Sequence, residues 1–249
     1  MVQDPETQTP GEYSDEQLEI MSLHAITDRL GNEGLCRRFE LEKSKFSPEQ
    51  QELLDKAYDL AMQLHKDDVR KSGEPATSHL LRVAIRVIHH FGVKDVNTIA
   101  GALLHDSLEE HVDELAGYKG AMIEEARAAL RTATNEEVEH LVYEVTNPEE
   151  EEGKDRLEQY WEHVPRLLKG DPKAAIIKIS DFIDNAAGLI YAPSDATEYR
   201  ATRYLPVIDS FKEAVMRPDV PLADDIRQKL LEQLEKTRER LIALHPDHN

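Results

Sequence analysis

The 249-residue chain has little cysteine, little positive charge and no long hydrophobic run. Its single cysteine, Cys36, excludes an intrachain disulfide and argues against a thiolate metal cluster. Lys plus Arg number 30 against 50 Asp plus Glu, a formal charge of −20 that argues against binding to nucleic-acid duplexes or anionic membranes. A local basic pocket or a cation can still attract a small anionic substrate. No apolar stretch approaches the roughly 18 residues of a membrane span, and the first ten residues lack a signal-peptide pattern, so we expect a cytoplasmic protein.

Convincing strand patterns, internal repeats and glycine-rich phosphate loops are also missing from the sequence. Apolar residues instead recur at helical spacing, so we predict an all-α fold. The clearest helix start is Ser47 as N-cap, with Pro48 in the first position and Gln50 in the capping-box position. Ser14 and Asn135 are further expected caps. Helices are expected over residues 15–30, 47–65, 78–90, 118–131, 136–144, 154–169 and 173–192, with one or two more over 219–245. Another is expected to open at Asp95 or Asn97 and to run to about residue 110.

An adjacent histidine and aspartate, His105 and Asp106, stand inside the apolar segment 101–110. Burying an imidazole and a carboxylate is costly unless something pairs with them, and a divalent metal ion satisfies both. Two more candidate ligands, His79 and Asp181, also lie among apolar residues. Two imidazoles and two carboxylates with room for water favour Mn²⁺, with Fe²⁺ or Mg²⁺ as alternatives, over a closed structural zinc site.

Each of the outlying residues also has a simpler interpretation. A lone histidine near a helix start, such as His79, is more often a cap or a hydrogen-bonded core residue. A lone aspartate such as Asp181 often bonds to nearby backbone. The adjacent pair is harder to explain without a metal, and it is the pair that favours the metal site.

Two glutamates, Glu109 and Glu110, follow the His-Asp pair by one helical turn. Residues four apart share a helix face, so Glu109 aligns with His105 and Glu110 with Asp106. A carboxylate in this place can hold an attacking water or protonate a leaving group. A solvated acidic helix end is an equal alternative on spacing alone.

Four segments together carry a resemblance to a known family. Arg70–Pro75 is followed by His79, 102–110 holds the His-Asp pair, 142–146 reads Val-Tyr-Glu-Val-Thr, and 178–185 has the pattern Lys-x-x-Asp-x-x-x-Asn. This order resembles the HD-domain phosphohydrolase superfamily and, more narrowly, the hydrolase domain of RelA/SpoT-type alarmone enzymes, including small stand-alone hydrolases. The resemblance covers roughly residues 50–192.

The resemblance implies an all-α HD-domain bundle that binds one Mn²⁺. It implies removal of pyrophosphate from the 3′ position of guanosine 3′,5′-bis(diphosphate) (ppGpp) or the pentaphosphate, a small anionic nucleotide. It also implies a role for each matching residue. The metal ligands would be His79, His105, Asp106 and Asp181, the water-handling residues Glu109 and Glu110, and the substrate-binding residues Arg70, Lys71, Lys178 and Asn185.

Some family positions are occupied by other residues here. The proline usual after the first histidine is Leu80, and the second acidic position, usually aspartate, is Glu110. In the family's Asp-Arg-Leu-His-Asn-Met-Arg-Thr run, two arginines and the threonine are replaced by Phe182, Ala187 and Gly188. Metal-dependent phosphohydrolysis is therefore the main expectation, with ppGpp as the best single substrate. The alternatives are hydrolysis of another nucleotide or phosphate ester, and a non-catalytic regulator that binds metal or nucleotide.

The resemblance also suggests how the chain is divided. We expect an acidic tail and helical extension over residues 1–46, the HD hydrolase domain over 47–192, and a helical extension packed on the core over 193–249. The amphipathic last helix is compatible with a homodimer.

Overall fold

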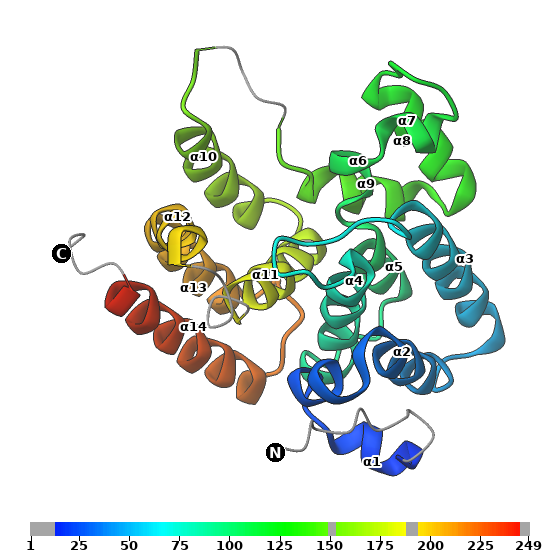
Figure 1. Cartoon of the computed structure of the whole chain (residues 1–249), viewed down its shortest axis with the longest axis horizontal. Coiled ribbons are helices and arrows are strands. Elements are labelled where there is room, and N and C mark those ends of the chain that lie inside the picture. The colour runs from blue at the N-terminus through cyan, green and yellow to red at the C-terminus, as the bar shows by residue number, and fades with distance from the viewer. Residues whose placement is uncertain (1–12, 149–152, 188–193, 245–249) are drawn as a thin grey trace, which may run out of the picture.

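The computed structural model of the chain is a bundle of helices (Figure 1). It describes residues 13–148, 153–187 and 194–244, and in these ranges the β-type pairing is limited to one isolated bridge between Val69 and Pro75. The all-α prediction is confirmed. The helices are α1 (Asp15–Ile20), α2 (Leu23–Lys43), α3 (Pro48–Leu64), α4 (Ala76–Ile85) with a π-helical turn (Arg86–His90), α5 (Val96–Leu104), α6 (Ser107–Glu110), α7 (Val112–Ala116), α8 (Ile123–Ala133), α9 (Glu136–Val145), α10 (Arg156–Lys169), α11 (Pro172–Ala187), α12 (Ser194–Tyr204) with a 3₁₀ turn (Leu205–Val207), α13 (Ile208–Met216) and α14 (Asp224–Leu244).

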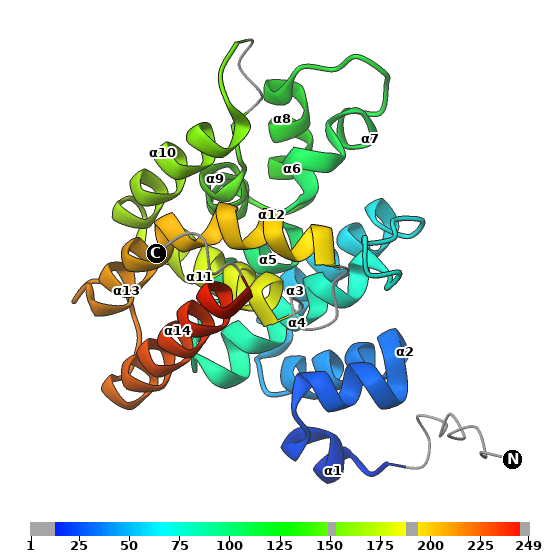
Figure 2. The ribbon, with the colours of Figure 1, turned by 60° about the vertical axis from the view of Figure 1, so that its left-hand side comes forward.

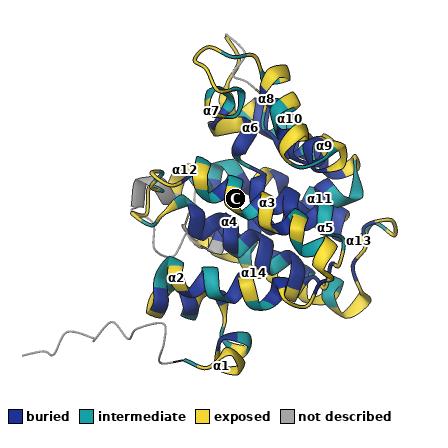
Figure 3. Cartoon of the chain, turned by 90° about the vertical axis from the view of Figure 1, so that its right-hand side faces the viewer, coloured by how far each residue is buried: buried dark blue, intermediate teal, exposed yellow. Residues whose placement is uncertain are grey.

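The core of the bundle is built around α5, whose residues from Thr98 to Leu104 are all buried. This helix packs against α3, α4, α9 and α11, so its apolar side chains meet neighbours on every side. Figure 3 shows the buried residues in the middle of the bundle and the exposed ones on outer helices such as α1 and α7. A helix apolar all round belongs in the centre of a domain, and α5 therefore fixes the position of the His-Asp pair at its end.

The expected caps form as the sequence predicts. The Ser47 hydroxyl accepts from the Gln50 backbone N–H, and the Gln50 side chain accepts from the Ser47 N–H, which completes the capping box of α3. Asn135 caps α9 by accepting from the N–H of Val138 at 2.9 Å. Ser14 caps α1 in the same way. These local bonds satisfy backbone donors that a helix start leaves free, which is why such starts are readable in sequence.

The prediction of a single helix over residues 15–30 is wrong. The chain breaks at Met21, and Ser22 caps a new helix by accepting from the N–H of Ala25. This second helix, α2, does not end at Gly31, because the glycine adopts φ 60° and ψ −150° and the helix resumes beyond it as far as Lys43. The helix end expected at residue 30 is therefore a kink inside a longer helix.

The helix that carries the His-Asp pair also ends earlier than expected. Helix α5 stops at Leu104, and Asp106, with φ −92° and ψ −7°, separates it from the short α6. His105 and Asp106 thus lie at a junction between two helices, where Asp106 lines a cavity and His105 is buried beside it. The backbone N–H of Glu110 still bonds to the Asp106 carbonyl, so the expected one-turn spacing is kept.

The last helices form a separate layer, the yellow-to-red part of Figures 1 and 2, beside α10 and α11. Phe182 of α11 is buried and its ring stacks on Phe211 of α13, with centroids 4.1 Å apart. The proposed boundary at 192/193 falls outside the described residues, and the division into extensions and domain stays a prediction. In the described part of the chain, no helix combines the length and the apolar character that crossing a membrane requires.

Candidate metal centre and substrate cavity

A cavity of about 670 Å³ opens where the helix junction meets α4, α10, α11 and α12. His79 enters it from the first turn of α4, Asp106 from the α5–α6 junction and Asp181 from the middle of α11. Three segments that are far apart in the chain therefore place histidine and carboxylate groups at one point. The volume suits a nucleotide-sized ligand.

His79, His105 and Asp181 form a buried cluster at this cavity. The two Nε2 atoms of His79 and His105 lie 3.2 Å apart, and Asp181 Oδ1 lies 3.3 Å from His79 Nε2. Asp106 completes the group, with Oδ1 3.2 Å from His105 Nε2 and Oδ2 3.7 Å from His79 Nε2. All four predicted ligands are thus brought together.

Hydrogen bonds on the far sides of the two rings set their tautomers. His79 Nδ1 lies 2.8 Å from the carboxylate of Asp184, and His105 Nδ1 lies 2.9 Å from the Ala102 carbonyl. Both partners are acceptors, so each Nδ1 carries the proton and donates it. With both rings neutral, each Nε2 would present a lone pair to the other, an arrangement that repels unless a proton or a metal ion lies between them.

The spacing of the cluster fits a metal ion. An ion with bonds of about 2.1 Å holds neighbouring ligand atoms roughly 3.0 Å apart in an octahedron and roughly 3.4 Å apart in a tetrahedron. The distances from His79 Nε2 and His105 Nε2 to each other and to the nearest carboxylate oxygens run from 3.2 to 3.7 Å. The described residues therefore contain a nitrogen and oxygen site suited to a divalent ion, whose identity the donor set does not fix.

The charged groups around the cluster also favour a cation at its centre. Burial disfavours the charged imidazolium of His105, but the negative charges of Asp106 and Asp181 outweigh it and raise the pKa of His105 to about 9. Burial alone would raise the pKa of Asp181, but Lys178 and the two histidines hold it well below its usual range. The site is strongly negative and favours a positive charge at its centre.

The two predicted water-handling glutamates differ in their surroundings. Glu109 is exposed, and its carboxylate accepts from the Asn147 side chain at 2.8 Å, which holds it at the cavity wall. Burial and the nearby carboxylates of Asp106 and Glu109 raise the pKa of Glu110 to about 7. A carboxyl group with a pKa near neutrality can both accept and donate a proton.

The predicted substrate-binding residues also line the cavity. Lys178 is buried and its Nζ lies 3.3 Å from Asp181 Oδ2, while Arg70 donates to Asn185, which in turn donates to Asp181. Lys71 is exposed on the loop at the entrance. The geometry brings these four residues together around the cluster, and their roles stay predictions.

The model of the HD domain family matches residues 57–205, more than half of the chain. The chain belongs to the HD-domain family. This confirms the family resemblance that the motifs indicate.

Relatives of this HD domain are found in bacteria and in animals. A protein of Mycobacterium leprae named probable GTP pyrophosphokinase is 26% identical over 77% of this chain and 24% of its own length. One of Aquifex aeolicus named guanosine-3′,5′-bis(diphosphate) 3′-pyrophosphohydrolase is 29% identical over 57% of this chain and 18% of its own length. The mouse protein named guanosine-3′,5′-bis(diphosphate) 3′-pyrophosphohydrolase MESH1 is 29% identical over 59% of this chain and 76% of its own length. The chain thus spans about a quarter or less of the two bacterial relatives.

A solved structure, described as a metazoan ortholog of SpoT that hydrolyzes ppGpp, shares the fold. Its TM-score is 0.56 at 21% identity, covering 77% of this chain and 96% of that one. At this identity the likeness establishes the helical HD architecture alone.

Further residues line the cavity that the sequence pattern does not predict. Arg200 and Arg203 of α12 add two cations, and Tyr160 of α10 lies under the Arg203 guanidinium at 4.1 Å. Asp184, whose carboxylate bonds to His79, was also missed. Spacing gave no signal for the α12 arginines, because only the folded chain shows which helix covers the cavity.

Three of the departures from the family pattern lie at residues 182–188. Phe182 belongs to the contact with α13, so an apolar ring there serves packing of the C-terminal layer. Gly188 lies outside the described residues, and the side chain of Ala187 is not described either.

Proposed function

We propose that the chain is a metal-dependent phosphohydrolase that converts guanosine 3′,5′-bis(diphosphate) to GDP and pyrophosphate. The observation that carries the proposal is the pair of facing Nε2 atoms, 3.2 Å apart, beside two carboxylates in a cavity with cationic walls. His79, His105, Asp106 and Asp181 would hold the ion, for which Mn²⁺ is our proposal and Fe²⁺ or Mg²⁺ the alternatives. When bound, such an ion polarises a phosphoryl oxygen and makes water a better nucleophile.

The residues of the chain supply the proton transfers. Glu109, held by Asn147, is placed to orient a water molecule at the wall. Glu110, with a pKa of about 7, is placed to take up a proton from water and to return one to the leaving group near neutral pH. The two neighbouring carboxylates thus have different environments, which is typical of acid–base pairs.

The residues that line the cavity favour the binding of a polyanionic substrate, although the chain has a net charge of −20. Arg70, Lys71, Lys178, Arg200 and Arg203 all line the cavity. Arginine guanidinium groups can bind phosphate through two parallel hydrogen bonds and can stack on a purine. The α12 arginines supply cations to a cavity in which Phe182 stands where the family has an arginine, and the ring of Tyr204 of α12 contacts Phe182.

The relatives' names support the substrate. Two of the relatives described above are named ppGpp 3′-pyrophosphohydrolases, and the mouse protein among them is matched over most of its length. We propose that the narrower activity of these relatives also belongs to this chain.

The proposal is tested by assaying the full chain, with Mn²⁺ and after chelation, on ppGpp, GDP and nucleoside monophosphates. We expect Mn²⁺-dependent pyrophosphate release from ppGpp alone, which Asp106→Asn abolishes. Glu109→Gln should lower kcat by about 10²–10⁴-fold while metal binding is unchanged.

The matched control is Glu213→Gln, an exposed carboxylate on α13 that does not line the cavity, which should leave the rate unchanged. Release of single phosphates from monophosphates would replace ppGpp by another phosphate ester. Stoichiometric metal without turnover of any substrate would favour the regulator, and an absence of metal binding would refute the proposal as a whole.

A further inference from the structure

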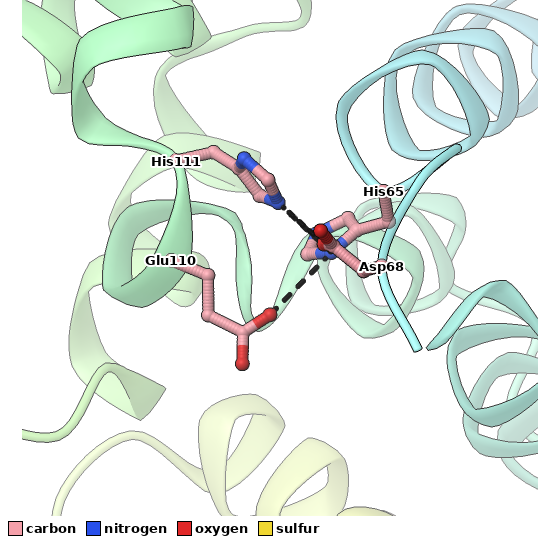
Figure 4. Close-up of side chains that lie close together, drawn as sticks. All are labelled: His65, Asp68, Glu110 and His111. Carbon is pink, nitrogen blue, oxygen red and sulfur yellow. Dashed lines mark hydrogen bonds and ion pairs between the residues drawn. The ribbon is translucent and has the colours of Figure 1, made fainter. Parts of the chain in front are cut away.

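A second group of histidines and carboxylates shares no residue with the first and is drawn in Figure 4. His65 ends α3, Asp68 is in the loop that follows, Glu110 ends α6, and His111 links α6 to α7. His65 and His111 are buried, with 1% and 8% of their surfaces exposed. Figure 4 shows the four side chains pointing toward one another, with His65 and Asp68 on one segment and Glu110 and His111 on another.

The ligand atoms of this group are tightly gathered. Asp68 Oδ2 lies 2.8 Å from His65 Nδ1 and 2.8 Å from His111 Nε2, and these two nitrogens are 3.2 Å apart. Glu110 Oε2 lies 3.5 Å from His65 Nδ1. All four atoms lie within 4.8 Å of one another.

We propose that His65, Asp68, Glu110 and His111 form a second metal site that takes a divalent first-row ion such as Zn²⁺. The distances of 3.2 and 3.5 Å match those between neighbouring ligand atoms around an ion with bonds of about 2.1 Å, and the two 2.8 Å contacts of Asp68 would lengthen slightly to accommodate it. Two imidazoles and two carboxylates form a donor set that such ions accept. On its outer side, His111 Nδ1 is buried without a hydrogen-bond partner, and the Glu114 carboxylate lies 3.6 Å away.

The competing arrangement is a hydrogen-bonded group without an ion. In that case both imidazoles carry a proton on the inner nitrogen and both donate to the single oxygen Oδ2 of Asp68, while Glu110 takes no part. The approach of Glu110 to the same point is what the ion explains and the hydrogen bonds do not.

An ion at this site would link two segments of the chain close to the substrate cavity. It would tie the end of α3 to the α6–α7 junction, two segments 46 residues apart in sequence. Glu110 also lines the substrate cavity, so the ion would stand at its rim. Glu110 would bind the ion through Oε2, the atom near His65, and keep Oε1 free for the proposed proton transfer. The pKa of about 7 is that of Glu110 without this ion, whose charge would lower it.

The test is metal stoichiometry, with Zn²⁺ and Co²⁺ alone as probes and no substrate. The full chain, stripped of metal and dialysed against each ion, should bind two ions. Asp181→Asn should remove the first site and keep the second, so one ion remains, and adding His111→Gln to that variant should remove it. Because each site is counted separately, failure of the second site is distinguishable from failure of the proposed hydrolase.

The matched control is His140→Gln, an exposed histidine on α9, which should leave both ions bound. A Co²⁺ titration of the unchanged chain, followed by visible absorbance, adds a measurement that no variant can compromise by misfolding. One ion in the unchanged chain, or a second ion that persists in both His111→Gln and Asp68→Asn, would overturn the proposal.

Discussion

The orientation of His79 depends on a carboxylate that binds no metal itself. Asp184 accepts from His79 Nδ1 at 2.8 Å and is held by Arg82 and Arg86, each with a nitrogen 2.9 Å from Oδ1. Burial would raise the pKa of Asp184, but His79 and the two arginines keep it well below its usual range. The carboxylate is therefore ionised and fixes the tautomer in which His79 Nε2 faces the cluster.

We predict that Asp184→Asn weakens metal binding by about 10–100-fold, the usual effect of losing the partner of a ligating histidine. The substitution also leaves buried arginine charge uncompensated, so the free energy of unfolding should fall by about 3 kcal/mol. Metal titration followed by a competing chromophoric chelator measures the first effect, and urea unfolding measures the second.

Glu74→Gln separates the two effects. Glu74 bonds to Arg82 at 2.8 and 2.9 Å but does not touch His79. This variant should lose stability and keep its metal affinity. Equal losses of metal affinity in both variants would show that Asp184 acts only through Arg82.

The sequence identifies some residues of the site and not others. His105 and Asp106 were readable because two ionisable groups stand side by side in an apolar segment. Asp184 was not, because its charge partners Arg82 and Arg86 are about a hundred positions away and only folding brings them close. His65 and His111 were missed for the same reason.

The shape of helix α2 depends on the backbone conformation of a single residue, Gly31. Gly31, at φ 60° and ψ −150°, bends the helix where residues with a Cβ are strongly disfavoured. The next residue, Asn32, accepts from the hydroxyls of Thr77 and Ser78 at 3.2 and 3.0 Å. The bend thus connects α2 to the first turn of α4, directly before His79.

We predict that Gly31→Ala lowers the free energy of unfolding by about 1–3 kcal/mol, although alanine is the better helix former. The reason is strain at the bend, since nothing lies within 4 Å of an added Cβ. Urea unfolding followed by circular dichroism measures it. Glu33→Ala, an exposed position two residues on with ordinary helical geometry, should change stability by less than about 0.5 kcal/mol, and an equal loss there would contradict the strain argument.

The elements were predictable where local bonds define them. The capping box at Ser47 and the cap at Asn135 lie within a few residues of the donors that they satisfy. The end of α5 at Leu104 and the continuation of α2 past Gly31 were not, because both depend on packing against other helices. Local chemistry specifies helix starts here, and tertiary contacts decide kinks and junctions.

For the whole molecule, acidic and basic groups are unevenly distributed. The chain carries a formal charge of −20, while five Lys and Arg side chains line the cavity. The composition shows the excess of carboxylates but cannot show this local reversal of charge. Repulsion among the excess carboxylates opposes the compact state, and dissolved salt screens it.

We therefore predict that raising NaCl from about 0.05 M to about 0.5 M stabilises the protein near neutral pH. A gain of about 1 kcal/mol corresponds to a rise of roughly 2–4 °C in Tm for a chain of this size. Differential scanning calorimetry of the metal-free protein measures it, so that ion binding at the clusters does not contribute. The control is the same salt step close to the sequence pI of about 4.9, where the net charge vanishes and the gain should disappear. An equal gain at both pH values would mean that salt acts through general exclusion from the surface, and that charge repulsion contributes little to the stability of this bundle.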